Sequence, residues 1–373
     1  MAIERICSSC FGDADLRRWI RSANGSRGCD ACGKFDSPTL SFDEVVERIE
    51  DGIGRYYGRA VDQLPYQTAE GGYIGRHWDS WEMLDEIDLS LPRDDGSLFS
   101  EIASSMHDEP WCEFDWLSLD TDAALRSSWQ QFCYTVKHKR RFFFHSTGTD
   151  DHDSYTPASL LDQIARISDG IGLIKVLPVG TKLWRARIDL LKRGKSTMAD
   201  FGPPPIEHAL QSNRMNPPGI PLLYLASSAL TALKETRSTE SRVGLLQVNR
   251  PLRILDLRQL PDVPGMFSDA NREHALSLRF LHDFADDIMT PVPRDKRVHI
   301  DYLPAQVVTE FFRDYPFTGG KVDGIAYGST LHARGWNVAL FLGPVDLGIE
   351  VPKWGAIPAP SLTLIKTKWL REA

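Results

Sequence analysis

The sequence lacks the features that would carry a protein into or across a membrane. No apolar run approaches the ~18 to 20 residues that a membrane-spanning helix needs. The first ten residues, MAIERICSSC, contain no basic segment followed by an apolar stretch, so they do not resemble a secretory signal. These absences predict a cytoplasmic protein with no membrane partner.

The chain also lacks the bias of a disordered protein. Apolar residues make up 42% and charged residues 25% of the sequence, which is typical of a globular protein. At 373 residues the chain is too long for one ordinary hydrophobic core, so we expect two domains.

No strongly basic stripe of the kind that binds nucleic acid is present, although the charge is uneven. The net charge of −8 divides into −13 up to Tyr155 and +5 from Thr156 onward. A basic cleft in the second part would suit a dianionic ligand, whereas a plain solvation pattern would give the same asymmetry. We therefore expect no nucleic-acid partner for the C-terminal half.

Cysteine is scarce, but four of the six cysteines lie in the first 32 residues. Cys7 and Cys10 form one C-x2-C pair, Cys29 and Cys32 form a second, and 18 residues separate the pairs. This spacing is typical of a structural zinc site with four thiolate ligands. Disulfides or free thiols are the alternatives, and a reducing compartment disfavours disulfides.

The rest of the N-terminal half has helical patterns. Ser41 with Glu44 three residues later forms a capping-box pattern, and apolar residues then recur at helical spacing. Further helices are expected at residues 81–87 and 121–144. The polar, turn-rich segment 146–157 is expected to form a linker. We predict a mainly helical, zinc-binding domain over residues 1–150.

From residue 155 to 373 the pattern changes to a mixed α/β domain, which makes the chain α+β as a whole. Short apolar strands are expected at residues 183–185, 222–226, 243–248, 253–256, 324–327 and 337–342. Helices are expected at residues 228–237 and 271–287.

Three of these segments bring a polar residue to the end of an apolar run. They carry Arg185, Glu235 and Ser329, and a proline-rich turn between the first two presents Arg214 and Asn216. Taken singly, each has an ordinary structural explanation: a surface arginine, a solvated helix face or a turn.

Together, the segments resemble the RES domain of bacterial toxin modules, which is named for its Arg, Glu and Ser. The matching blocks are LWRAR at 183–187, RMNPPGIPLLYLA at 214–226, TALKE at 231–235, DGIAYGS at 323–329 and GWNVALF at 335–341. The N-terminal half resembles the zinc-knuckle, HEPN-like domain that precedes some RES domains. One departure is Gly328, where many relatives have proline before the serine.

This resemblance implies an ADP-ribosyltransferase-like fold that binds NAD and cleaves its nicotinamide–ribose bond, as in an NAD-degrading toxin or defence effector. It assigns catalysis to Arg185, Glu235 and Ser329. The NAD-binding residues it implies are Arg185, Arg214, Asn216, Tyr224 and Asn337. A cognate antitoxin or trigger protein and a homo-oligomer are the protein partners it leaves open.

The chemistry agrees with these residue types. A carboxylate stabilises the oxocarbenium-like ribose of the transition state, and the planar fork of arginine binds pyrophosphate oxygens in pairs. Tyr224 would stack on nicotinamide, and Ser329 would bond a phosphate or ribose group. The sequence has no G-x-G-x-x-G followed by an acidic residue ~20 positions later, so nothing in it supports a Rossmann hydride-transfer site.

Several alternatives remain open at this level. The same residues would serve a protein ADP-ribosyltransferase, and the acceptor in NAD cleavage is either water or phosphate. A non-catalytic NAD-sensing module is a further reading. Arg140 and His145, five residues apart, also resemble the Arg–His pair of HEPN ribonucleases, although an acidic domain is a poor surface for RNA.

Overall fold

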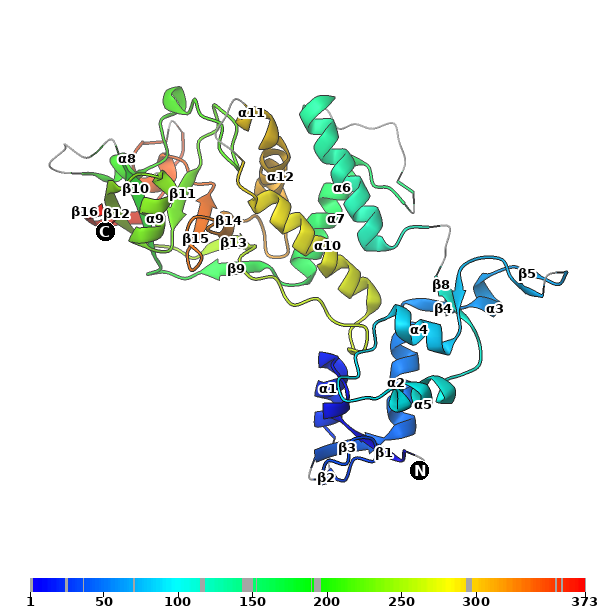
Figure 1. The fold of residues 1–373 in the computed structure, drawn as a ribbon. Coiled ribbons are helices and arrows are strands. Elements are labelled where there is room, and N and C mark those ends of the chain that lie inside the picture. The colour runs from blue at the N-terminus through cyan, green and yellow to red at the C-terminus, as the bar shows by residue number, and fades with distance from the viewer. Residues whose placement is uncertain are drawn as a thin grey trace. The chain divides into compact units, whose positions relative to one another are not determined.

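A computed structural model of the chain describes residues 3–23, 26–35, 37–69, 71–114, 118–142, 150–151, 153–188, 190, 196–292, 297–352, 354–356 and 358–372. The chain forms two compact units (Figure 1). The first comprises residues 1–121 and 262–277, and the second comprises residues 122–261 and 278–373. No described helix is long and apolar enough to cross a membrane.

The first unit contains short strands and five α-helices among its described residues, before the start of α10 (Arg272–Met289). Its first sheet has the order β1-β3-β2, its second has the order β4-β8-β7, and β5 pairs with β6. The elements are β1 (Arg5–Cys7), η1 (Ser8–Cys10), α1 (Ala14–Arg21), β2 (Ser26–Arg27), β3 (Ser37–Ser41), α2 (Phe42–Gly54), β4 (Tyr57–Arg59), α3 (Ala60–Gln63), β5 (Tyr66–Gln67), β6 (Gly72–Tyr73), β7 (His77–Trp78), α4 (Ser80–Glu86), α5 (Ser97–Ser105) and β8 (Trp111–Glu113).

Helix α2 supports the core of this unit. The predicted capping box is confirmed: Ser41 Oγ accepts a hydrogen bond from Glu44 N, and the Glu44 carboxylate accepts one from Ser41 N. These bonds satisfy two backbone donors at the helix start. Val45, Ile49 and Ile53 then share one face of the helix and are fully buried.

The second unit is built on an eight-stranded mixed sheet with the order β16-β12-β10-β11-β15-β14-β13-β9. The six strands predicted from the sequence are the six inner ones, and the two edge strands, β9 and β16, were not predicted. Among the described strands of this sheet only β13 and β14 run parallel. The strands are β9 (Ile174–Leu177), β10 (Lys182–Arg187), β11 (Leu223–Ala226), β12 (Glu240–Val248), β13 (Leu252–Asp256), β14 (Gly324–Gly328), β15 (Trp336–Leu340) and β16 (Leu362–Arg371).

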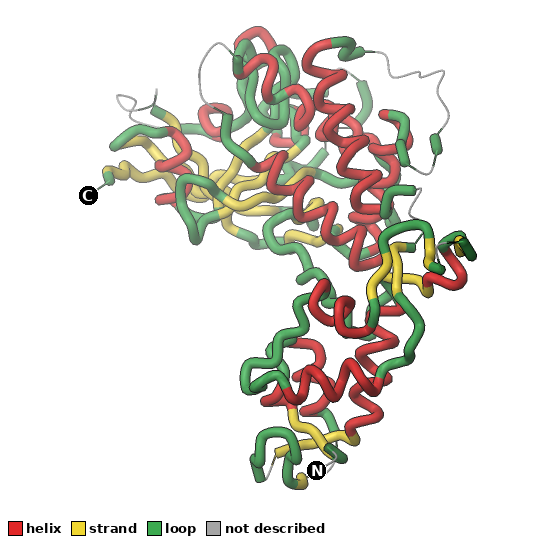
Figure 2. The backbone as a smooth tube through the Cα atoms, turned by 45° about the vertical axis from the view of Figure 1, so that its right-hand side comes forward, coloured by secondary structure: helices red, strands yellow, loops and turns green. Residues whose placement is uncertain are grey.

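Both faces of this sheet are covered. Along β15, Val338 and Leu340 enter one buried cluster and Ala339 enters another, as the alternation of a strand requires. Long helices pack on the Ala339 side, and Figure 2 shows them in red beside the yellow strands. The helical elements are α6 (Thr121–His138), α7 (Pro157–Gly170), α8 (Met198–Phe201), η2 (Ile206–His208), α9 (Ala229–Thr236), the C-terminal part of α10, α11 (Val298–Asp301), α12 (Leu303–Asp314) and η3 (Val345–Leu347).

Helix α6 is shorter than predicted. It ends at His138, before the expected end at Phe144. His145 of the proposed ribonuclease pair lies outside the described residues. Residues 146–149 and 152 of the predicted linker also lie outside them. Its last residues have a defined role, since the Thr156 side chain accepts a hydrogen bond from Ser159 N and caps α7.

Candidate active site and four-cysteine cluster

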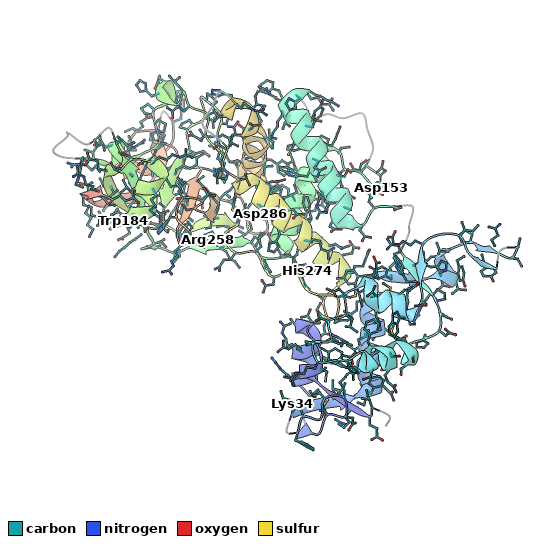
Figure 3. All side chains as sticks on the ribbon, in the orientation of Figure 1. Lys34, Asp153, Trp184, Arg258, His274 and Asp286 are labelled. Atoms are coloured by element: carbon teal, nitrogen blue, oxygen red, sulfur yellow. The ribbon has the colours of Figure 1, made fainter. Side chains whose placement is uncertain are left out.

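The second unit contains a cavity of about 620 Å³ at one end of its sheet. Strands β10, β11, β14 and β15 contribute to its wall, together with helices α9 and α11 and the turn before β11. In Figure 3 the label Trp184 marks β10, the strand that carries Arg185. Five of the predicted site residues line this cavity: Arg185, Arg214, Tyr224, Glu235 and Asn337.

Glu235 lies in the last turn of α9 and is held from the neighbouring strands. Its Oε1 accepts a hydrogen bond of 2.7 Å from Ser329 Oγ and another of 2.7 Å from Asn337 Nδ2. No described residue bonds to Oε2. One carboxylate oxygen is thus fixed by the protein, and the other remains able to contact a ligand in the cavity.

Ser329 follows β14 and lies behind the carboxylate instead of lining the cavity. Its hydroxyl accepts a hydrogen bond of 3.1 Å from His332 N while it donates to Glu235. The preceding Gly328 does not need its glycine, because its φ is not positive and a Cβ there would meet no atom within 4 Å. Hydrogen bonds, not backbone stiffness at position 328, therefore hold this loop.

Arg185 is only 9% exposed, and its Nη1 has no hydrogen-bond partner among the described residues. Burial, together with the positive charge of Arg187, lowers the pKa of the Arg185 guanidinium well below its ordinary value. The neighbouring Arg187 is already engaged, since it donates to the carbonyl oxygens of Asp200 and Gly202. A buried cation without a counter-charge is unfavourable, so this site favours an anionic ligand.

Tyr224 lines the cavity from β11 and is fixed at its hydroxyl. The hydroxyl donates to Asn216 Oδ1 at 2.7 Å and accepts from Met215 N at 3.2 Å. Burial raises the pKa of Tyr224, so the phenol stays neutral. Asn216 is 3% exposed and does not line the cavity. Its side chain holds Tyr224 in place.

Aromatic and basic side chains form another part of the cavity wall. The Arg214 guanidinium lies 5.4 Å from the ring centre of Tyr327. Tyr302, Val298 and His299, from the segment of α11, complete this side of the cavity. Tyr327 belongs to the DGIAYGS block and was available to sequence reasoning, whereas no sequence pattern pointed to residues 298–302.

Two family models match the chain. A model of the RES domain matches residues 182–364, which include every residue of the cavity wall. The chain contains a RES domain. A model described as HEPN/RES N-terminal domain 1 matches residues 22–150. Both predicted resemblances are thereby confirmed, and RES domains are associated with NAD-related toxin activity. No curated protein and no solved structure matches the chain.

The four N-terminal cysteines of this RES-domain protein meet in space. Their sulfur atoms all lie within 4.8 Å of one another, and the neighbouring pairs are 3.6, 3.6 and 3.9 Å apart. A tetrahedral metal with bonds of ~2.3 Å to sulfur requires sulfurs ~3.8 Å apart. Gly33 directly follows the second cysteine pair and has a φ of 68°, in the left-handed region that favours glycine. The Cys7 amide donates a hydrogen bond to Cys29 Sγ at 3.3 Å. The cluster can therefore bind a metal ion.

Proposed function

We propose that the RES domain cleaves the nicotinamide–ribose bond of NAD, and that the loss of NAD arrests growth. One observation carries the proposal. The cavity is lined both by the buried Arg185, whose Nη1 has no partner among the described residues, and by Glu235, whose Oε1 is held by two hydrogen bonds. This pairing suits a substrate with an anionic linker and a reacting centre that becomes cationic.

The anionic part of the substrate is the pyrophosphate. Arg185 would bind it through Nη1, which has no partner among the described residues, and Arg214 would add a second cation from the turn before β11. Since Arg185 is already buried, little reorganisation accompanies binding. NAD fits this role because its pyrophosphate joins two nucleosides, and the cavity volume of about 620 Å³ lies within the range of ligand pockets.

The reacting centre is the nicotinamide ribose, beside Glu235. The C1–N bond breaks with its electron pair going to nicotinamide, which leaves as a neutral molecule and needs no acid. Glu235 Oε2 stabilises the positive charge that develops on the ribose. Water or phosphate then forms the new C1–O bond, and the proton of an attacking water passes to Glu235 or to solvent.

The other predicted residues have supporting roles. Ser329 and Asn337 orient Glu235 through its Oε1, and Tyr224 offers its ring to the nicotinamide. Asn216 keeps Tyr224 in this orientation. The assignment of Ser329 and Asn216 thus changes from ligand contacts to residues that position the groups in contact.

Product analysis identifies the acceptor and tests the proposal. Purified full-length protein is incubated with NAD alone, with NAD and phosphate, and with NAD and cell protein. We expect nicotinamide release without a protein acceptor, with ADP-ribose or its 1-phosphate as the second product. ADP-ribose found only on protein would instead identify a protein ADP-ribosyltransferase. Binding of NAD without any product would identify a non-catalytic NAD sensor.

For the N-terminal half we propose a structural Zn²⁺ bound by Cys7, Cys10, Cys29 and Cys32. A four-thiolate site leaves no open position, so the ion would stabilise the fold and take no part in NAD cleavage. We further propose a functional division into residues 1–150 and 155–373, which differs from the division into compact units, since residues 122–150 belong to the second unit. The first part would bind a cognate antitoxin or a trigger protein.

A further inference from the structure

The loop between β14 and β15, residues 329–335, is tied to helix α9 by a second link besides Ser329 and Glu235. His332 Nδ1 lies 2.8 Å from Thr231 Oγ1, and Thr231 is fully buried. The Thr231 hydroxyl lies 2.7 Å from Ser228 Oγ, the group that caps the start of α9. The loop is therefore joined to both ends of the helix that carries Glu235.

We propose that His332 is a positioning residue for Glu235 and that it acts through Ser329. The inference rests on the proposed cleavage of NAD. His332 does not line the cavity, so its effect on the reaction must pass through other groups.

Hydrogen bonds connect His332 to Glu235 through Ser329. The His332 amide donates to Ser329 Oγ at 3.1 Å, and Ser329 Oγ donates to Glu235 Oε1 at 2.7 Å. Because the amide occupies an acceptor position on Ser329 Oγ, the hydroxyl hydrogen is directed toward Glu235. The imidazole anchors this amide by its bond to Thr231, and either ring tautomer preserves that bond.

Backbone hydrogen bonds and close packing leave the loop of residues 329–335 little room to move. Ser329 N donates to Gly335 O at 2.9 Å, and Gly335 N donates to His332 O at 2.7 Å. A Cβ on Gly335 would lie 2.5 Å from Thr231 Oγ1 and 2.8 Å from His332 Nδ1. A loop this tightly closed transmits a displacement of His332 to Ser329.

The transition state depends on this placement more than substrate binding does. Glu235 acts on a charge that appears only as the nicotinamide bond breaks, whereas binding in the ground state relies on Arg185 and Arg214. A loosened Glu235 therefore lowers kcat and leaves KM nearly unchanged.

The test compares His332→Ala with His332→Asn in the full-length protein. We expect His332→Ala to lower kcat about 10- to 100-fold with KM within about twofold, since a misplaced group costs this much. Asparagine places a polar atom near the position of Nδ1 and should restore most of the loss. Leu331→Ala, in the same loop but 37% exposed, is the matched control and should keep wild-type kcat.

A double-mutant cycle with Ser329→Ala shows whether the effect passes through the serine. In the Ser329→Ala background, adding His332→Ala should change kcat by less than about twofold, because coupled residues are not additive. Wild-type kcat in a folded His332→Ala protein, independent losses that multiply, or no restoration by asparagine would each overturn the inference.

Crystal structures supply a readout that does not need turnover. In His332→Ala the Ser329 Oγ–Glu235 Oε1 distance should exceed hydrogen-bond range, and in His332→Asn it should stay near 2.7 Å. An unchanged distance in His332→Ala contradicts the positioning role. By contrast, a wild-type protein that releases no nicotinamide contradicts the proposed function. The distances in the two variants would still show whether His332 positions Glu235.

Discussion

Asn337 donates a hydrogen bond of 2.7 Å to the Oε1 atom of Glu235. The two residues are 102 positions apart, and β15 and α9 bring them together. The resemblance to RES domains had assigned Asn337 to NAD binding. Its amide instead contacts the carboxylate that we place at the reacting ribose, while the residue still lines the cavity.

This contact predicts different results for two substitutions of Asn337. Asn337→Ala removes one hydrogen bond to a charged group and should lower kcat about 10- to 100-fold. Asn337→Asp keeps the shape but sets a second negative charge against Glu235, so its kcat should fall further, by about 100-fold or more. Steady-state rates of nicotinamide release measure both. An aspartate variant as active as wild type would contradict the contact.

We expect Arg185 to strengthen NAD binding and to lower the stability of the folded protein. Arg185→Met removes a buried charge that has no counter-charge among the described residues. It is expected to raise the free energy of unfolding by ~1 to 4 kcal/mol while abolishing NAD binding. Arg185→Lys keeps the charge but loses the planar fork, so affinity should fall without the gain in stability. Thermal unfolding and calorimetric titration with NAD measure the two effects. A methionine variant that unfolds more easily and still binds NAD would refute this role.

The cavity tyrosines predict sensitivity to alkaline pH. Burial raises the pKa of both Tyr224 and Tyr327 above the ordinary value of 10.0. Above pH 10 the two phenols therefore keep their protons in the folded state and lose them in the unfolded chain. Their contribution to the free energy of unfolding is fully present below pH 10 and falls as the pH rises above it. Tyr224→Phe and Tyr327→Phe should each reduce this fall, as followed by urea denaturation between pH 9 and 11. Equal pH dependence in all three proteins would argue against buried phenols.

Metal removal should affect the first unit. We expect one Zn²⁺ per chain, with loss of the ion and lower thermal stability in Cys10→Ser or after treatment with a strong chelator. Cys133→Ser is the control, because Cys133 lies outside the cluster. Elemental analysis measures the bound zinc, and thermal unfolding measures the stability of each protein. Purified protein that is stable and free of metal would show that the four thiols need no ion.

The sequence predicted the fold best where the pattern was local. The capping box of Ser41 and Glu44 depends on residues three apart, and inner strands such as β11 and β15 contain short apolar runs. The edge strands were missed because they alternate only weakly: Lys175 and Val176 of β9 are both exposed, as are Ile365 and Lys366 of β16. Edge strands bury less surface, so their patterns are weaker.

The sequence grouped several residues that line the cavity, but it did not give their arrangement. Arg185, Tyr224 and Glu235 line one cavity, as their grouping in the sequence suggested. The sequence could not show that Ser329 points to Glu235 or that Asn216 points to Tyr224, because these contacts depend on how strands and loops pack. Tyr302 was missed for the same reason: it enters the cavity from a segment with no motif.

The central claim is that Glu235 acts on the nicotinamide ribose of NAD, and one comparison tests it most directly. Nicotinamide release from NAD is measured for purified wild type, for Glu235→Gln, and for Glu240→Gln, a glutamate paired with Arg371 outside the cavity. We expect steady release by wild type and Glu240→Gln, and a loss of about 100-fold or more in Glu235→Gln. Equal release by wild type and Glu235→Gln, or no release by wild type, would contradict it.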